Sequence, residues 1–167
     1  PALLTVLQTK VRVAQPDEHE QLAELYLRWD YRGGIDDADI VYVAEQGDRP
    51  VGLVRRTFEC GVTMLRGMHV DPAHHSQGVG SQLLHALVAD LTGQECFCMP
   101  FTHLIAFYER GAFAVIDEDA APEFLVKRLY QYRQKGYNVL IMRRAGARHV
   151  HRLANQVAAD ERLLVNE

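Results

Sequence analysis

The first half of the chain alternates between short β-branched runs and tight polar turns. Three such runs, residues 40–46, 51–59 and 62–70, follow one another with only a few residues between them. Runs of this length joined by short turns are typical of an antiparallel meander. An earlier run, residues 4–14, is also rich in β-branched residues, and we expect it to be a further strand.

Helical periodicity first appears after Pro16, a residue that the first turn of a helix tolerates well. The pattern predicts a helix between the first strand and the meander. Its apolar positions lie at the i, i+3, i+4 and i+7 spacing of one helix face and are Leu22, Leu25, Tyr26 and Trp29.

From residue 71 onward, helical and strand patterns alternate. A leucine-rich stripe predicts a helix that Gly93 ends. A meander followed by such alternation predicts an α+β domain with a mixed, mostly antiparallel sheet flanked by helices. Further strands are expected at 95–99, 112–116 and 138–144, and further helices at 101–110 and 122–136, the second of these lying between the last two strands.

We expect residues 1–146 to form one domain and residues 147–167 a C-terminal helical extension. The extension is too sparsely apolar for a core helix. It is therefore expected to lie across the surface or to pack on a second subunit in a homodimer. Its apolar residues at helical spacing are Val150, Leu153, Val157 and Leu164.

Composition narrows the class of protein. With 18 basic and 22 acidic residues, the net charge is −4, which gives no electrostatic reason to expect a nucleic acid partner. Three cysteines do not suggest a disulfide framework and fit reduced thiols. No apolar run approaches the ~20 residues that span a bilayer, and no signal peptide pattern is present. We expect a cytoplasmic protein that binds neither nucleic acid nor membrane.

A glycine-bearing turn, DPAHHSQGVGS at residues 71–81, leads into the leucine-rich helix. Each glycine costs about 1 kcal/mol in a helix interior. The first N–H groups of a helix lack intrahelical partners and carry partial positive charge, and glycine lets a phosphate approach them. Gly78 and Gly80 therefore suggest an anion site. The alternative is an ordinary turn with Ser76 as N-cap.

Two nucleotide-binding motifs are excluded here. The turn lacks the Gly-Lys-Ser/Thr of a phosphate loop, and Leu83 stands where G-x-G-x-x-G needs its third glycine. The nearby histidines do not predict a metal site, because adjacent histidines rarely ligate one ion and the spacing is not that of a zinc site. These histidines are His69, His74, His75 and His103.

Residues 68–84, MHVDPAHHSQGVGSQLL, resemble the acyl-CoA signature of the GNAT superfamily of N-acetyltransferases. Residues 103–113, HLIAFYERGAF, resemble the helix of that family whose tyrosine lies beside the sulfur of the cofactor. The resemblance implies a GNAT-like fold over about residues 4–143. The sequence departs from the family at three positions: His75 replaces an arginine or glutamine, Ser76 a common glycine, and Phe101 a frequent asparagine.

The resemblance implies transfer of an acetyl group from acetyl-CoA to a primary amine of a small molecule or peptide, by direct attack. The Met68 N–H would polarise the acetyl carbonyl, Val70 would bind the pantetheine arm, and Tyr108 would protonate the departing thiolate. The implied cofactor-binding residues are Met68, His69, Val70, His75, Ser76, Gln77, Gly78, Val79, Gly80 and Ser81.

The proton acceptor is less clearly marked in the sequence. In relatives that use a strand glutamate as the base, the matching position in this chain is Met64. Methionine cannot act as a base. Glu59, His69, Glu95 and a chain of waters remain. We favour Glu59, because strand alternation places His69 on the face opposite Met68. A non-catalytic acyl-CoA-binding sensor or interaction module of the same fold is the alternative function.

Two further features stay open at this point. Cys96 and Cys98 share one face of a strand and either pack in the core or line the thioester pocket. The helix at 122–136 either borders a substrate entrance or is a solvated surface helix. The polar residues on which that choice depends are Lys127, Arg128, Tyr130 and Tyr132.

Overall fold

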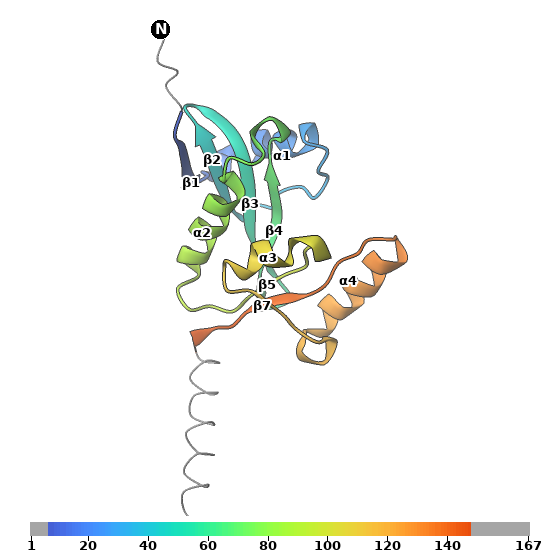
Figure 1. The fold of residues 1–167 in the computed structure, drawn as a ribbon. Helices are drawn as coiled ribbons and strands as arrows, with labels where there is room; N and C mark the ends of the chain where they lie inside the picture. The colour runs from blue at the N-terminus through green and yellow to red at the C-terminus, as the bar shows by residue number, and fades with distance from the viewer. Residues whose placement is uncertain (1–6, 148–167) are drawn as a thin grey trace, which may run out of the picture.

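The computed structural model describes residues 7–147, which form a seven-stranded sheet with helices on both faces (Figure 1). The strand order is β1-β2-β3-β4-β5-β7-β6. The sheet is mixed and mostly antiparallel, so the predicted α+β class is confirmed. The expected helical extension from residue 147 lies almost wholly outside the described residues.

The predicted meander is present as four antiparallel neighbours: β1 (Thr9–Val13), β2 (Ile40–Gln46), β3 (Arg49–Glu59) and β4 (Val62–Val70). The first strand begins at Thr9, later than expected. Thr9 pairs with Gln46, the last residue of β2, so Leu7 and Gln8 have no partner on that strand.

The second half of the sheet has shorter strands than expected. They are β5 (Cys96–Cys98), β6 (Ala114–Val115) and β7 (Met142–Arg144). β5 runs parallel to β4 and antiparallel to β7, which also pairs with β6. The apolar run before β7 is buried mainly by packing, because Val139 and Ile141 join a core cluster outside any strand, and its pairing is limited to an isolated bridge between Val139 and Phe101.

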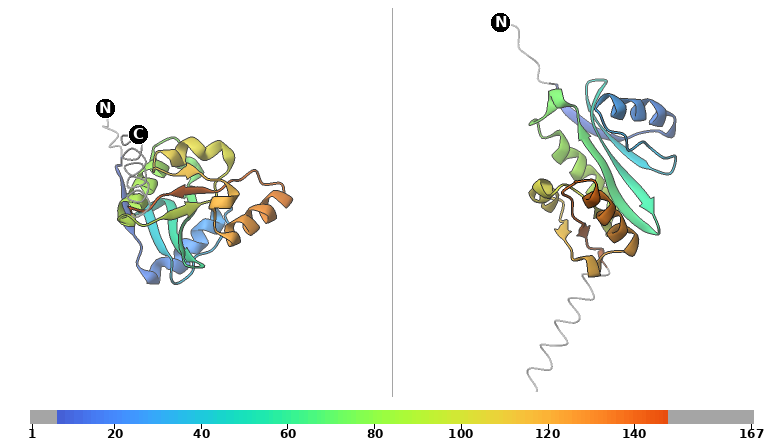
Figure 2. Two further views of the ribbon diagram at one scale, coloured as in Figure 1. Left: turned by 90° about the horizontal axis from the view of Figure 1, so that it is seen from below. Right: turned by 90° about the vertical axis from the view of Figure 1, so that its right-hand side faces the viewer.

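Helices cover both faces of the sheet (Figure 2). On one face lie α2 (Val79–Leu91) and α3 (Ile105–Glu109), and on the other lie α1 (His19–Arg28) and α4 (Glu123–Gln134). The expected helix at 101–110 is split, because a 3-10 helix, Thr102–Leu104, precedes α3. Other 3-10 helices are Pro16–Glu18, Pro72–His74 and Glu118–Ala120.

Three apolar clusters hold these layers. The leucine stripe of α2 packs on the sheet together with Tyr108 and Phe113. On the opposite face, Leu22 and Tyr26 of α1 pack on β2 and β3. Leu125 and Leu129 of α4 pack beside them, against Met64 and Phe97. The inserted helix α4 thus lies between β6 and β7 in sequence, as predicted, and covers the same face as α1.

Two irregularities in β4 shape the centre of the molecule. The register between β3 and β4 shifts opposite Gly67, which has a φ of 65°. The carbonyl of Gly67 accepts a 2.7 Å hydrogen bond from the Tyr26 hydroxyl. In addition, the recorded pairing between β4 and β5 is the single pair Met64 and Phe97, so the two parallel neighbours separate beyond it.

Candidate active site

A cavity of about 480 Å³ lies where β4 and β5 separate. Both faces of the sheet contribute to its walls. The lining residues are Met64 to His69 of β4, Cys98 to Phe101 around the end of β5, Leu104 and Tyr108 near α3, Arg128 and Tyr132 of α4, Asp30 and Tyr31 after α1, and Tyr137 and Val139 before β7.

The glycine turn begins α2 without a side-chain cap. The N-cap residue is Gly78, with a φ of 76°, and no side chain hydrogen-bonds to the first turn. Ser76, the alternative N-cap, lies two residues earlier with a φ of 64°, so the alternative of an ordinary Ser76-capped turn is wrong. Because the first N–H groups of α2 have no cap and the turn is exposed, its backbone fits a phosphate group.

The two adjacent histidines, His74 and His75, contact residues at the end of β4 and just after it. The Nε2 atom of His75 lies 3.0 Å from the carbonyl oxygen of Val70. The Nδ1 atom of His74 lies 3.4 Å from Asp71 Oδ2, and Asp71 Oδ1 accepts a hydrogen bond from the N–H of Ala73. These contacts fix the path from β4 into the turn.

At the end of β4, alternate residues face opposite sides of the sheet, as expected. Met68 and Val70 pack against the α2 cluster. His69 instead lies on the α1 side, where its ring is 4.4 Å from that of Tyr31, and it lines the cavity. Burial lowers the pKa of His69, and the nearby charge of His75 lowers it further. Its imidazole is therefore neutral at neutral pH and able to accept a proton.

Tyr108 lines the cavity from the α3 side and is only 6% exposed. Its ring packs edge-on against Phe107 and Phe113. Burial, with smaller contributions from Cys98 and Tyr31, raises the pKa of Tyr108 well above its ordinary value. The phenol is therefore protonated, and its hydroxyl is a donor. Cys98 lines the same cavity and is buried in the core as well, which combines both alternatives for this residue.

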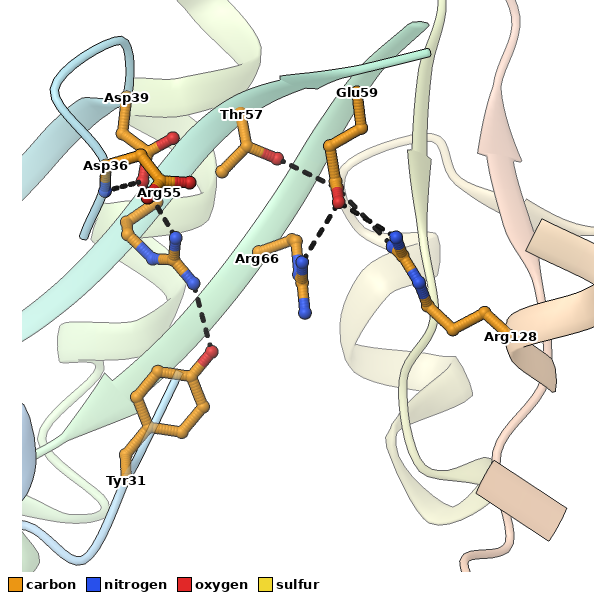
Figure 3. Close-up of polar contacts among 8 residues, drawn as sticks. All are labelled: Tyr31, Asp36, Asp39, Arg55, Thr57, Glu59, Arg66 and Arg128. Atoms are coloured by element: carbon orange, nitrogen blue, oxygen red, sulfur yellow. Dashed lines mark hydrogen bonds and ion pairs between the residues drawn. The ribbon is translucent and has the colours of Figure 1, made fainter. Parts of the chain in front are cut away.

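Glu59 does not line the cavity, and its carboxylate is held by two arginines (Figure 3). Arg66 Nη1 lies 3.1 Å and Arg128 Nη2 2.9 Å from Glu59 Oε1. Burial acts to raise the pKa of Glu59, but the hydrogen bond from Arg128 and the charges of both arginines outweigh it, so the pKa lies below its ordinary value. A carboxylate in this state is a weak base.

Glu95, the other carboxylate considered as base, also lies apart from the cavity lining, with Oε2 3.9 Å from Arg143 Nε. Of the three side chains considered, the structure brings His69 alone to the cavity wall together with Tyr108.

A buried ion pair beneath the cavity was missed in the sequence, where residues 32–39 suggested only a loop. Arg55 Nη1 lies 2.8 Å from Asp39 Oδ2, and both side chains are nearly inaccessible (Figure 3). Arg55 Nη2 donates to the hydroxyl of Tyr31 at 3.1 Å. The pair therefore positions Tyr31, which packs on His69. The available signal was Arg55, which directly follows the apolar run Val51–Val54 in the strand.

The inserted helix α4 contributes part of the cavity wall. Arg128 and Tyr132 line the cavity, whereas Lys127 and Tyr130 do not. Tyr130 instead donates a 2.7 Å hydrogen bond to Glu118. One side of the helix thus borders the cavity and the other is solvated.

Over residues 7–147, no three His, Cys, Asp or Glu side chains converge as a metal site would require. In the same part of the chain, no helix has the length and apolar character needed to cross a bilayer.

Residues 37–115 match the family model described as "Acetyltransferase (GNAT) domain". No curated protein matches the chain. Solved structures share the fold at low identity. A GNAT-family acetyltransferase from Streptococcus pneumoniae is 16% identical, with a TM-score of 0.60 over 81% of this chain and 98% of that one.

Two further structures contain coenzyme A. N-acetylglutamate synthase from Neisseria gonorrhoeae, complexed with coenzyme A and N-acetyl-glutamate, is 20% identical, with a TM-score of 0.61 over 82% of this chain and 35% of that one. A Mycobacterium tuberculosis protein in complex with CoA is 17% identical, with a TM-score of 0.59 over 81% of this chain and 98% of that one. The chain thus resembles GNAT acetyltransferases in sequence over residues 37–115, and it shares their fold over most of its length.

Proposed function

We propose that this protein transfers the acetyl group of acetyl-CoA to a primary amine. The observation that carries the proposal is the uncapped start of α2 beside a cavity whose opposite walls hold Tyr108 and His69. A protonated phenol and a neutral imidazole can act as acid and base in thioester aminolysis, and an anion site can hold the diphosphate of the cofactor. Structures of the same fold with bound coenzyme A support the choice of cofactor.

Backbone groups of the glycine turn hold the cofactor in this proposal. Acetyl-CoA supplies a thioester and an anionic diphosphate. The turn meets the diphosphate with exposed amides, and the end of β4 contacts the pantetheine arm. The residues assigned to cofactor binding are Met68, His69, Val70, His75, Ser76, Gln77, Gly78, Val79, Gly80 and Ser81.

Three groups of the chain then act on the reacting atoms. His69 accepts the proton that the amine loses as its nitrogen bonds to the acetyl carbon. The N–H of Met68 donates to the acetyl oxygen, an interaction worth roughly 3 kcal/mol in a well-aligned transition state. Tyr108 donates its proton to the sulfur as the carbon–sulfur bond breaks.

This assignment moves the base from Glu59, which the strand pattern favoured, to His69. Glu59 is engaged by two guanidinium groups and lies off the cavity wall, whereas His69 is neutral and on it. We propose that Glu59 positions Arg66 and Arg128.

The expected setting of the enzyme follows from its composition. We propose a cytoplasmic enzyme that acts on a small-molecule or peptide amine, without nucleic acid or membrane partners, and that the extension from residue 147 supports a homodimer.

Calorimetry with CoA and acetyl-CoA, followed by free-thiol release with a panel of primary amines, tests the proposal. We expect heat on binding and thiol release that depends on the amine. Binding without release for any amine would favour the non-catalytic sensor or interaction module. No heat at millimolar cofactor would overturn both functions.

A further inference from the structure

We propose that the acceptor amine also carries a carboxylate group, and that Arg128 of α4 and Arg66 of β4 recognise that carboxylate. The inference deepens the proposed function and rests on it, because it concerns the acceptor half of the same cavity.

The cavity has an excess of positive charge at its α4 end. Arg66 and Arg128 both line it, and a single carboxylate, Glu59, lies between them (Figure 3). Two guanidinium groups and one carboxylate leave a net charge of about +1 at this end. Guanidinium groups match the planar shape of a carboxylate and bind it through paired hydrogen bonds.

The opposite end of the same wall suits the amine. Asp30 and Tyr31 line the cavity after α1, and His69 lies against Tyr31. A carboxylate and a neutral imidazole favour a cationic ammonium and then its deprotonation. The cavity is thus negative or uncharged at the end where the amine reacts and positive at the end formed by α4.

Residue spacing fits an acceptor that spans both ends. Arg66 and His69 lie on the same strand, and three residues of strand cover about 10 Å. Tyr132 and Tyr137 line the wall near Arg128 and provide apolar surface for the intervening part of the acceptor.

The arginines are not needed merely to dock α4. Leu125 and Leu129 are 0% and 2% exposed and already anchor that helix to the sheet. Arg128 keeps 23% of its side chain exposed and packs over the ring of Phe124, with its guanidinium carbon 5.5 Å from the ring centre. A guanidinium that is both ordered and accessible is suited to binding a ligand.

The test compares amino acids with their carboxamides. The series runs from α-amino acids to linear ω-amino acids, so the separation of amine and carboxylate varies. Each acid is compared with its own carboxamide, which lacks the negative charge. Acetyl transfer and calorimetry on the CoA-loaded protein are both measured. For at least one member of the series, we expect the acid to bind and react about tenfold or more better than its amide. A charge-assisted hydrogen bond supplies a preference of this size.

Arg128→Gln should reduce that preference to near unity, and Arg133→Gln on the same helix should retain it, because Arg133 pairs with Glu118 and does not line the cavity. A merely structural loss in Arg128→Gln would weaken acid and amide equally. Glu59→Gln should shift the preference further toward the acid, since it removes the competing charge while its amide oxygen can still accept a hydrogen bond from Arg128.

Equal use or binding of acids and amides throughout the series would overturn the inference while leaving acetyl transfer intact. If the protein fails to bind CoA, the same calorimetric pairs are run on the free protein, and binding of acids no tighter than of amides again overturns it. A failure of the proposed function is seen separately, as the lack of cofactor binding or of thiol release.

Discussion

A phenol buried among apolar side chains keeps its proton far above neutral pH, and Tyr108 is such a group. Tyr108→Phe removes the proton donor but keeps the ring that packs on Phe107 and Phe113. We expect kcat to fall roughly a hundredfold while CoA affinity changes little. Steady-state kinetics with calorimetry measures both quantities. Tyr130→Phe, an exposed tyrosine off the cavity wall, is the control, and unchanged turnover in Tyr108→Phe would remove this residue from its role.

The lowered pKa of His69 predicts how kcat/KM depends on pH. Its pKa is lowered from 6.5 by burial, so the folded protein holds the neutral imidazole at pH values where a free histidine is protonated. As base, it makes kcat/KM rise with pH to a plateau reached near neutrality, with the midpoint below 6.5. His69→Gln should lose this acidic limb, and His85→Gln on the exposed side of α2 should keep it. An unchanged limb in His69→Gln would assign the titration to another group.

The placement of residues in local turns and helices could be predicted from the sequence, whereas contacts between residues distant in the sequence could not. The placement of Gly78 at the start of α2 follows from a local turn pattern, and that of Tyr108 in α3 from a short motif that resembles the family. Glu59 was placed on a strand near the site, but its partner Arg128 is 69 residues away. Nothing near Glu59 in the sequence marks that ion pair.

At the scale of elements, the start of α2 has a charge preference that can be tested. Ser81 is exposed in the first turn, where an acidic side chain stabilises a helix through its dipole but repels an anionic ligand. Ser81→Glu should therefore raise the melting temperature slightly while weakening CoA binding roughly tenfold. Ala89→Glu, exposed near the other end of the same helix, adds the same charge and should leave CoA affinity unchanged.

The loop between α1 and β2 is held by a buried ion pair, and breaking it from one side leaves a buried charge. We expect Asp39→Asn to lower the free energy of unfolding by about 3 kcal/mol, because Arg55 is 3% exposed and keeps its charge. Urea denaturation measures this loss. Asp37→Asn, exposed in the same loop, should change stability by less than about 0.5 kcal/mol. Equal effects of the two substitutions would show that the pair of Arg55 and Asp39 does not stabilise the fold.

Element boundaries show where sequence patterns and hydrogen bonding diverge. The apolar run at 138–144 predicted a long strand, yet β7 begins only at Met142. Val139 and Ile141 are apolar because they pack under α4, and their pairing is limited to an isolated bridge between Val139 and Phe101. The run predicted burial correctly and pairing only in part.

At the scale of the whole molecule, the cofactor half of the proposed site lies within one part of the chain, whereas the acceptor half also draws on segments outside that part. The glycine turn and Tyr108 lie inside residues 37–115, the part that matches the family model. Tyr31 and Arg128 lie outside it, on the segment after α1 and on the inserted helix. The order of elements was predictable over most of the sheet, because it follows a common fold. The contacts of α4 were not, because they depend on how one inserted helix packs.

The narrow contact between β4 and β5 has a mechanical consequence. The two strands are parallel neighbours and pair through Met64 and Phe97. Beyond that pair, the facing backbone edges of β4 and β5 do not hydrogen-bond to each other. A ligand lodged there would take the place of a missing strand and tie the two arms of the sheet together. Amide hydrogen exchange along residues 65–70 should then slow when CoA is added, while exchange in the β1–β2 ladder stays the same. In that case the cofactor would join β4 to β5 as well as supply the acetyl group.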